Sequence, residues 1–308
     1  MERKIVSIVV VIAIVVSFFC CRNYMSVDNQ IERFYNNATE SIPNAVLYDL
    51  SEDEVIFEKG IDEKISIGSV MKILTACVGL KYYDLKDTIV VGEEFEYNLE
   101  GDSSRSMIEP GQVITFEQLL YAILIPSGSD AAYTLAVNTA RKINNDPDMP
   151  IEKAVNCFAG EMNKYAEELG CKSTHLVYPD GQDHKKQHTC ISDVIIIAKD
   201  ALKYDILREI FSTYYAEVEL ASGEVYEWYN TNYMLCDESD YYFEGCLGIK
   251  TGHTQKAGYC LLSYAERDGK QLLSVVCNCA TKVERFKIAS RLFEVGFFAE
   301  KLEKGIRT

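Results

Sequence analysis

Short apolar runs bounded by turn residues lie near the two ends of the chain, and this pattern predicts β-strands there. Asp268-Gly269 separates two of these runs and is a dipeptide that favours a tight hairpin. Ser222-Gly223 is expected to turn the chain in the same way between two earlier strands. The predicted strands are residues 44–50, 54–59, 214–220, 224–229, 246–250, 258–265 and 271–279.

The middle of the chain instead carries apolar residues three and four positions apart, which is the spacing of an amphipathic helix. Thr115 and Gln118 form a capping-box pattern that opens one helix. Pro126 ends that helix, and Gly170 ends another. The predicted helices are residues 69–83, 115–124, 130–142, 151–169, 193–204 and 282–298. We therefore predict an α/β fold of the α+β type, in which strands from both chain ends build one antiparallel sheet and a helical subdomain is inserted between them.

The amino-terminal residues have the pattern of an export signal or a signal anchor. Arg3 and Lys4 precede an uncharged apolar run at 5–21, whose length is at the lower limit for spanning a bilayer. The residues that follow are too bulky for a cleavage site, so we expect 1–22 to remain as a membrane anchor. A polar spacer at 23–41 and one folded domain at 42–300 would follow, on the extracytoplasmic face of the cell membrane.

Three alternatives to this anchor stay open. Residues 1–22 could be cleaved as a signal peptide, and the protein would then be secreted. Cys20 or Cys21 could carry a lipid. The apolar run could also be buried as an amino-terminal strand or a core helix.

The composition is that of a folded globular protein, with 48% hydrophobic, 25% charged and 11% aromatic residues in a chain of 308. The formal net charge of −16 would repel a polyanion, so we expect no nucleic acid partner; an anionic polymer would need a local basic cleft. The eleven cysteines include no Cys-x-x-Cys pair, which disfavours a zinc ribbon or a thioredoxin-like site. Beyond Cys20 and Cys21 an odd number remains, so they cannot all pair within one chain.

Ser69 and Lys72 form the first of three motifs that could support nucleophilic chemistry. Ser69 starts a predicted helix, where its backbone N–H can face an oxyanion. Lys72 lies three residues on, on the same helical face, and can take the serine proton if burial or cationic neighbours lower its pKa. Taken alone, a serine and a lysine at this spacing are also typical of a solvated helix surface.

The second motif is the Ser-Gly-Ser run at 127–129, between two predicted helices. Its tight loop can project the Ser127 hydroxyl into a cleft, and Gly128 can let a ligand approach closely. The same run is also typical of a plain helix–helix turn in which Ser129 or Asp130 caps the second helix.

The third motif is the Lys-Thr-Gly run at 250–252, at the end of a predicted strand. Lys250 and Thr251 together suit a carboxylate, and Gly252 leaves room for a peptide along the strand edge. Each motif alone is a weak signal, but the order and spacing of all three are specific.

With these motifs in this order, the chain resembles the serine-type D-alanyl-D-alanine carboxypeptidases, the low-molecular-weight penicillin-binding proteins of the β-lactamase/transpeptidase-like fold. The resemblance is carried by residues 65–76, 119–132, 174–183, 230–232 and 248–259. It implies that the protein trims the terminal D-alanine from peptidoglycan stem peptides ending in D-Ala-D-Ala. It also implies that β-lactam antibiotics acylate the same site, and that no metal or other cofactor takes part.

The resemblance assigns the chemical steps to particular residues. Ser69 would be the nucleophile, Lys72 its proton acceptor, and Ser127 a relay of protons toward the leaving D-alanine. The backbone N–H groups of Ser69 and His253 would form the oxyanion hole. Water would then hydrolyse the acyl-enzyme.

Substrate binding would fall to the second and third motifs. Lys250 and Thr251 would hold the terminal carboxylate of the substrate, with Gly252 beside them. One position departs from the family, which usually has asparagine where this chain has Ser129. A carboxamide both donates and accepts and reaches further than a hydroxyl, so we expect Ser129 to lower activity or shift substrate preference.

Other function classes remain as alternatives. A β-lactamase of the same fold needs a base for deacylation, commonly a glutamate, and residues 172–189 contain none. A zinc peptidase could use His184 and His188, but no glutamate follows His184 and the lysines between them disfavour a cation. A membrane-anchored penicillin-binding sensor with weak or no turnover could keep the fold. The sequence also does not separate carboxypeptidase from endopeptidase or transpeptidase action.

Overall fold

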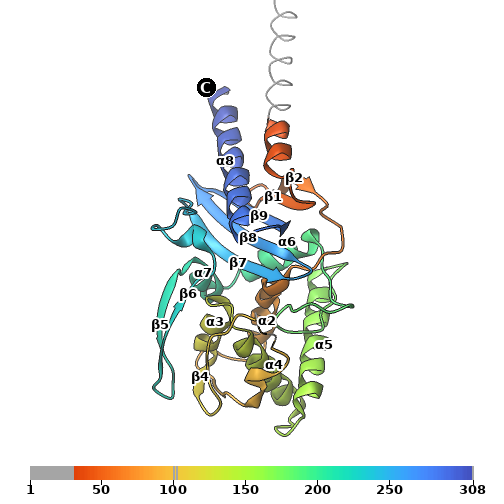
Figure 1. Ribbon diagram of the computed structural model, residues 1–308, viewed down its shortest axis with the longest axis vertical. Coiled ribbons are helices and arrows are strands. Elements are labelled where there is room, and N and C mark those ends of the chain that lie inside the picture. The colour runs from red at the N-terminus through yellow and green to blue at the C-terminus, as the bar shows by residue number, and fades with distance from the viewer. Residues whose placement is uncertain (1–30, 100, 102, 307–308) are drawn as a thin grey trace, which may run out of the picture.

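Five strands drawn from both ends of the chain form one antiparallel sheet in the order β2-β1-β9-β8-β7 (Figure 1). The structure, a computed structural model, describes residues 31–99, 101 and 103–306. The strands are β1 (Asn44–Asp49), β2 (Glu54–Lys59), β7 (Cys246–Thr254), β8 (Gly258–Arg267) and β9 (Lys270–Cys279). The predicted α+β fold, with its sheet built from both chain ends, is confirmed.

The central strands separate two apolar cores, because successive side chains of a strand point to opposite faces of the sheet. In β1, Leu47 packs toward the closing helix α8 (Lys282–Ile306), whereas Val46 faces the inserted helices. The predicted hairpin joins β8 to β9. Asp268 has φ 52° and Gly269 has φ 82°, the left-handed pair that a tight hairpin turn requires.

The inserted helices lie on the side of the sheet opposite α8 (Figure 1). Thr115 and Gln118 make the predicted capping box, in which the side chain of each accepts a hydrogen bond from the backbone N–H of the other. Gly170 ends α5 in the left-handed conformation, at φ 93°. The helices are η1 (Gly68–Met71), α2 (Lys72–Gly79), α3 (Phe116–Leu124), α4 (Ser129–Asn144), α5 (Ile151–Leu169), α6 (Ile191–Ala201) and α7 (Asp205–Ser212).

Several short elements of the structure are not predicted by the sequence pattern. These are α7, the strands β3 (Thr88–Val90) and β4 (Val113–Thr115), and the 3-10 turns η2 (Glu93–Glu96) and η3 (Tyr233–Leu235). They are too short for a periodic pattern to develop. The predicted helix at 69–83 is also shorter, because its first turn is η1 and α2 ends at Gly79. The hairpin predicted around 222–223 forms as β5 (Tyr215–Glu219) and β6 (Val225–Tyr229), a two-stranded sheet of its own.

Residues 31–38 form a helix and not the polar spacer that the sequence predicts for 23–41. Tyr35 on this helix is buried, and its ring stacks on Phe57 of β2 with 5.1 Å between ring centroids. The chain is therefore packed on the sheet from residue 31 onward. The predicted anchor at 1–22 lies outside the described residues. Within the part of the chain that is described, no helix combines the length and apolar character needed to cross a membrane.

The nine cysteines among the described residues are all free thiols. Cys77 and Cys277 are fully buried in apolar surroundings, where cysteine packs as a small hydrophobic side chain. In this part of the chain, packing takes the place of disulfide cross-links.

Candidate active site

Ser69 and Lys72 meet where the turn η1 leads into α2. Lys72 is fully buried, and its Nζ lies 2.8 Å from Oγ of Ser69 and 3.0 Å from Oγ of Ser129. Val70 and Met71, the residues between the pair, are buried in the apolar core and so fix the turn. The lysine reaches the serine, as the helical spacing predicts, and Ser129 joins the contact.

The Lys72 ammonium is held in an environment that disfavours its charge. Burial lowers the pKa of Lys72 to about 8, although the carboxylates of Asp180 and Asp130 oppose the shift. With this pKa, an appreciable fraction of the lysine is neutral near pH 7 and has a lone pair for a proton. Lys72 therefore has both the distance and the pKa of a general base toward Ser69.

Ser127 lies in the loop between α3 and α4 and has a left-handed backbone, at φ 66°. This conformation is strained for a serine and persists where neighbouring groups fix it. Here Gly128 N–H donates to the carbonyl of Ala122 at 3.0 Å, and Ser129 N–H donates to the carbonyl of Ser104 at 2.8 Å. Ser127 is nearly buried, and its remaining exposed surface faces the cavity described below.

The loop at 127–129 is not a simple helix–helix turn in which Ser129 or Asp130 caps the second helix. The N-cap position of α4 is Gly128, which makes no side-chain hydrogen bond, so neither Ser129 nor Asp130 caps the helix. The Asp130 carboxylate instead accepts hydrogen bonds from the backbone N–H and hydroxyl of Ser106 and from the N–H of Met107. Asp130 thereby fastens the segment that follows residue 103 against α4.

Lys250 and Thr251 lie on β7. Lys250 is almost fully buried, and its Nζ lies 3.1 Å from the carbonyl oxygen of Thr251. The Thr251 hydroxyl lies 2.5 Å from the hydroxyl of Thr231. Burial lowers the pKa of Lys250 well below its ordinary value, and the cations Lys72 and Arg285 lower it further. An anion bound here would relieve that repulsion.

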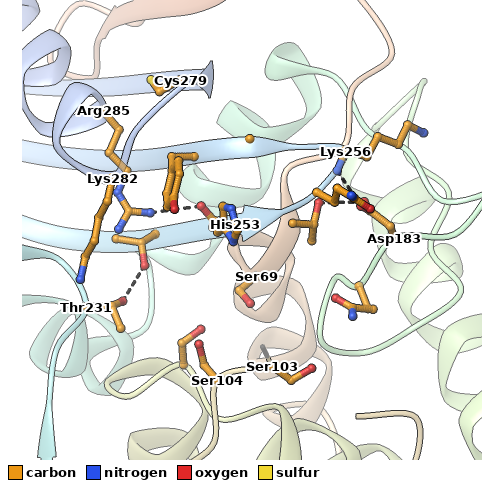
Figure 2. Close-up of a pocket in the computed structure, with 18 of the residues that line it drawn as sticks. Ser69, Ser103, Ser104, Asp183, Thr231, His253, Lys256, Cys279, Lys282 and Arg285 are labelled. Atoms are coloured by element: carbon orange, nitrogen blue, oxygen red, sulfur yellow. Dashed lines mark hydrogen bonds between the residues drawn. The ribbon is translucent and has the colours of Figure 1, made fainter. Parts of the chain in front are cut away.

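Arg285, in the first turn of α8, is the candidate that sequence reasoning missed. It is 3% exposed, and its guanidinium donates to the carbonyls of Gly252 at 3.1 Å and Cys260 at 3.3 Å. Its Nε has no hydrogen-bond partner among the described residues, and burial lowers its pKa to about 10. Figure 2 shows the side chain reaching from its helix toward the strand that carries His253. Together with Lys250, Arg285 makes a basic cleft suited to a carboxylate.

A cavity of about 950 Å³ connects these groups. In Figure 2, Ser69 stands near its middle, between Ser103 and Ser104 on one side and His253 on the other. The predicted site residues in its lining are Ser69, Ser127, Ser129, Thr251, Gly252 and His253. Lys72 and Lys250 are buried outside the lining but contact residues within it. The predicted site residues are therefore assembled around one cavity, large enough for the end of a peptide.

Residues 35–281 match peptidase family S11, the D-alanyl-D-alanine carboxypeptidases. The chain belongs to this family. The match covers most of the chain and spans all three motifs. It also accounts for the shared order of the serine–lysine turn, the loop at 127–129 and the strand β7.

Two curated relatives show how far the similarity extends. The D-alanyl-D-alanine carboxypeptidase of Streptomyces sp. strain K15 is 31% identical over 251 residues, which cover 79% of this chain and 82% of the relative. The D-alanyl-D-alanine carboxypeptidase DacF of Bacillus subtilis is 27% identical over 257 residues, which cover 82% of this chain. Those residues are 61% of DacF, so this chain spans less than two thirds of that relative.

Solved structures share the fold. The crystal structure of the Streptomyces K15 DD-transpeptidase has a TM-score of 0.75 at 27% identity, covering 83% of this chain and 98% of that one. Penicillin-binding protein D2 of Listeria monocytogenes, in its ampicillin-bound form, has a TM-score of 0.67 at 26% identity with the same coverage. The predicted transpeptidase-like fold is confirmed.

The two motif glycines serve packing, a role that the sequence did not predict; that they also give a ligand access stays a prediction. A Cβ on Gly252 would lie 2.1 Å from the carbonyl oxygen of Ile67, so the glycine lets β7 approach η1. A Cβ on Gly128 would lie 2.6 Å from a carbonyl oxygen of α3. The close approach of β7 also brings the backbone nitrogen of His253 to 2.9 Å from a Cβ built on Gly68, beside Ser69.

His184 and His188 do not join the cleft. His184 packs edge-on against Tyr178, and His188 lies 6.1 Å from His175 between ring centroids. Neither histidine lines the cavity that holds Ser69. Across the described ranges, no group of histidine, cysteine, aspartate and glutamate is arranged to hold a metal ion, so the zinc-peptidase alternative gains no support.

Proposed function

We propose that this protein is a serine-type D-Ala-D-Ala carboxypeptidase that removes the terminal D-alanine from peptidoglycan stem peptides. The observation that carries the proposal is the 2.8 Å contact of buried Lys72 with Ser69, in a cleft lined by Arg285 and Thr251 with Lys250 buried directly behind it. A nucleophile, its base and a positive site for a carboxylate are the parts that this reaction needs. Membership of the S11 family supports the same reaction.

Substrate recognition rests on the basic side of the cleft. Lys250, Thr251 and Arg285 bind the terminal carboxylate of the peptide, which sets the scissile carbonyl beside Ser69. Binding an anion offsets the mutual repulsion of the two buried cations. A peptide whose end lacks the carboxylate charge is therefore a poor substrate.

Acylation follows from the serine–lysine contact. Lys72 accepts the proton of Ser69 as Oγ attacks the carbonyl carbon. The backbone N–H groups of Ser69 and His253 stabilise the oxyanion, by about 3 kcal/mol for each donor. Ser127 passes a proton to the leaving nitrogen of D-alanine, and water then hydrolyses the acyl-enzyme.

β-Lactam antibiotics are the second ligand class that we propose for the same serine. Ampicillin is bound in the Listeria relative, which shares the fold of this chain. A β-lactam acylates Ser69 through the same base, but its leaving group stays attached to the ester. The adduct can therefore be detected as a gain in mass.

Transpeptidation is a second candidate function, because the Streptomyces K15 structure is that of a DD-transpeptidase. Hydrolysis and transpeptidation share the acyl-enzyme and differ in whether water or an amine accepts it. A penicillin-binding sensor would form the acyl-enzyme and release little product. Assays with and without an amine acceptor separate these functions. A carboxypeptidase forms the hydrolysed product, a transpeptidase forms the transferred product when the amine is present, and a sensor forms neither.

The decisive experiment is D-alanine release from a peptide ending in D-Ala-D-Ala. We expect steady release by the full chain, with none from Ser69→Ala. A peptide of the same sequence ending in L-Ala-L-Ala is the matched control and should remain intact. Absence of D-alanine release together with stable penicillin binding would favour the sensor.

For location, we propose the extracytoplasmic face of the cell membrane, with residues 1–22 as an uncleaved anchor. Basic residues followed by the apolar run at 5–21 support this assignment. Amino-terminal sequencing of the protein from the membrane fraction should then recover the intact amino terminus. A mature protein that begins near residue 23, or at a lipidated cysteine, would contradict the anchor.

A further inference from the structure

Two carboxylates lie close enough to Lys72 to influence its charge, Asp130 and Asp180. The Asp130 carboxylate is engaged by hydrogen bonds from Ser106 and Met107 and from the backbone N–H of Ala131. Asp130 is also absent from the lining of the cavity. Its role is therefore to hold the neighbouring loop.

Asp180 differs from Asp130 in both respects. It lines the cavity together with Ser69, although the residue as a whole is only 3% exposed. Within the described residues its carboxylate accepts one hydrogen bond, from the backbone N–H of Gln182 at 3.1 Å. An ionised carboxylate can accept several hydrogen bonds, so Asp180 retains acceptor capacity at the cavity that holds the nucleophile.

The loop that carries Asp180 is fixed on both sides. The Thr75 hydroxyl donates to the carbonyl of Pro179 at 2.5 Å, which ties the loop to α2. A Cβ on Gly181 would lie 2.1 Å from the carbonyl oxygen of Gly68, so the loop is in direct contact with the turn that precedes Ser69. The backbone on both sides of Asp180 is therefore fixed next to the turn that precedes Ser69, and Asp180 lines the same cavity as that serine.

Asp183, the other acidic residue of this loop that lines the cavity, has its carboxylate engaged. It accepts hydrogen bonds from the Ser66 hydroxyl at 2.6 Å and the Thr254 hydroxyl at 2.8 Å. It also accepts one from the backbone N–H of Lys256 at 2.9 Å (Figure 2). These contacts join the segment before Ser69 to the end of β7. Asp183 is a structural clamp, which leaves Asp180 as the carboxylate of this loop with free acceptor capacity.

We propose that Asp180 is a further catalytic residue, the general base that activates water to hydrolyse the Ser69 acyl-enzyme. This inference rests on the function proposed above. Acylation and deacylation would then use two different bases, Lys72 for the serine and Asp180 for water. The sequence stretch 172–189 lacks a glutamate, but Asp180 lies within it and supplies a carboxylate.

The step balances without any further reactant. The water oxygen forms a bond to the acyl carbon while Asp180 accepts one of the water protons. The bond between the acyl carbon and Oγ of Ser69 then breaks, and the proton held by Asp180 is returned to Oγ, directly or through Nζ of Lys72. The products are the shortened peptide acid and free Ser69. The same step acts on a penicilloyl ester, so the protein should slowly hydrolyse penicillin.

The test separates the two half-reactions in Asp180→Asn, which keeps the size of the side chain and removes the base. Acylation by penicillin is followed by the gain in intact mass, and deacylation by the loss of the adduct after excess drug is removed. We expect no fall in the acylation rate, because loss of the Asp180 charge lowers the pKa of Lys72 further and so increases its neutral fraction. The deacylation rate should be lower by about 10²- to 10⁴-fold. Steady-state D-alanine release should fall with the deacylation rate.

Asp183→Asn is the matched control, since it removes a clamping carboxylate from the same loop. We expect it to lower the melting temperature and to slow acylation and deacylation together. If Asp180→Asn does not fold, Asp180→Ser is smaller, keeps an acceptor for Gln182 and carries the same prediction. An adduct that leaves either Asp180 variant at the wild-type rate overturns the inference, and so does a parallel loss of both steps. If wild type forms no adduct on Ser69, the proposed function itself is wrong.

Discussion

Two buried lysines of the same cleft differ in what surrounds them. Lys72 contacts the hydroxyls of Ser69 and Ser129 at 2.8 and 3.0 Å, with two carboxylates near enough to raise its pKa in part. Lys250 contacts a backbone carbonyl, and the charged groups that shift its pKa are the cations Lys72 and Arg285. Burial lowers the pKa of both lysines.

The comparison shows that the two lysines differ in their neighbours and not in burial alone. Beside hydroxyls, a lysine with a pKa of about 8 can exchange a proton with a nucleophile. A lysine beside other cations is destabilised in its charged form by electrostatic repulsion. A bound carboxylate offsets that repulsion.

Replacing Lys72 should have the largest effect. Lys72→Ala removes the base and should lower the acylation rate by about 10⁴-fold, because serine and lysine act as a unit. Lys72→Arg is the control, since it keeps a positive charge that cannot lose its proton near neutral pH. Stopped-flow acylation by a chromogenic β-lactam measures both variants. If Lys72→Arg retains the wild-type rate, charge and not proton transfer is what matters.

The pH dependence of acylation follows from the pKa of Lys72. In the proposed mechanism the neutral lysine is the base, so the rate should rise with pH and level off above the pKa of about 8. Each pH unit below that value should cost about tenfold, so the rate at pH 6 should be about 100-fold below the plateau. A rate that is flat from pH 6 to pH 9 would remove Lys72 from the role of base.

Replacing Arg285 tests the proposed carboxylate site around Lys250. Arg285→Gln can still donate to backbone carbonyls but loses the charge, and kcat/KM for a free-acid peptide should fall by about 30-fold. The same peptide with a carboxamide end should lose less than about threefold, because its end has no charge to recognise. Steady-state kinetics with the two peptides provides the measurement. Equal losses for both would mean that Arg285 only supports the packing of β7.

Ser129 should give the smallest effect. The hydroxyl already contacts Nζ of Lys72, so Ser129→Asn regains only the contact to the substrate amide, worth about 1 kcal/mol. Peptide turnover should then rise about fivefold, and Ser129→Ala should lower it by a similar factor. If Ser129→Asn lowers turnover, the cleft is adapted to the hydroxyl and its natural substrate differs from the usual one of the family.

The sheet and most helices could be predicted because their signals are local. The capping box of Thr115 and Gln118, the stop at Gly170 and the turn at Asp268 each depend on residues a few positions apart. The motif residues could be predicted for the same reason, since each motif spans four residues or fewer. Local sequence signals were therefore sufficient to identify the motif residues of the candidate site.

The sequence does not show which faces of the helices, strands and loops pack against one another. Arg285 reaches the cleft only because α8 packs on β8 and β9 and its side chain extends to carbonyls of β7 and β8, and the helix pattern alone does not show this. Asp180 lies in a loop without periodicity, and its position depends on contacts with Thr75 and Gly68 that are distant in sequence. The helix at 31–38 does carry a local signal, because its apolar residues stand at positions 31, 34, 35 and 38, the spacing of an amphipathic helix. The signal covers only two turns inside a polar stretch, and the prediction of a spacer there was wrong.

The most direct test of the account is intact mass spectrometry of the full chain after exposure to penicillin, followed by digestion. We predict the addition of one acyl group, on the peptide that contains Ser69, and no addition to Ser69→Ala under the same conditions. An adduct on any other peptide, or none at saturating drug, would contradict the assignment of Ser69 and Lys72 as the nucleophile and its base.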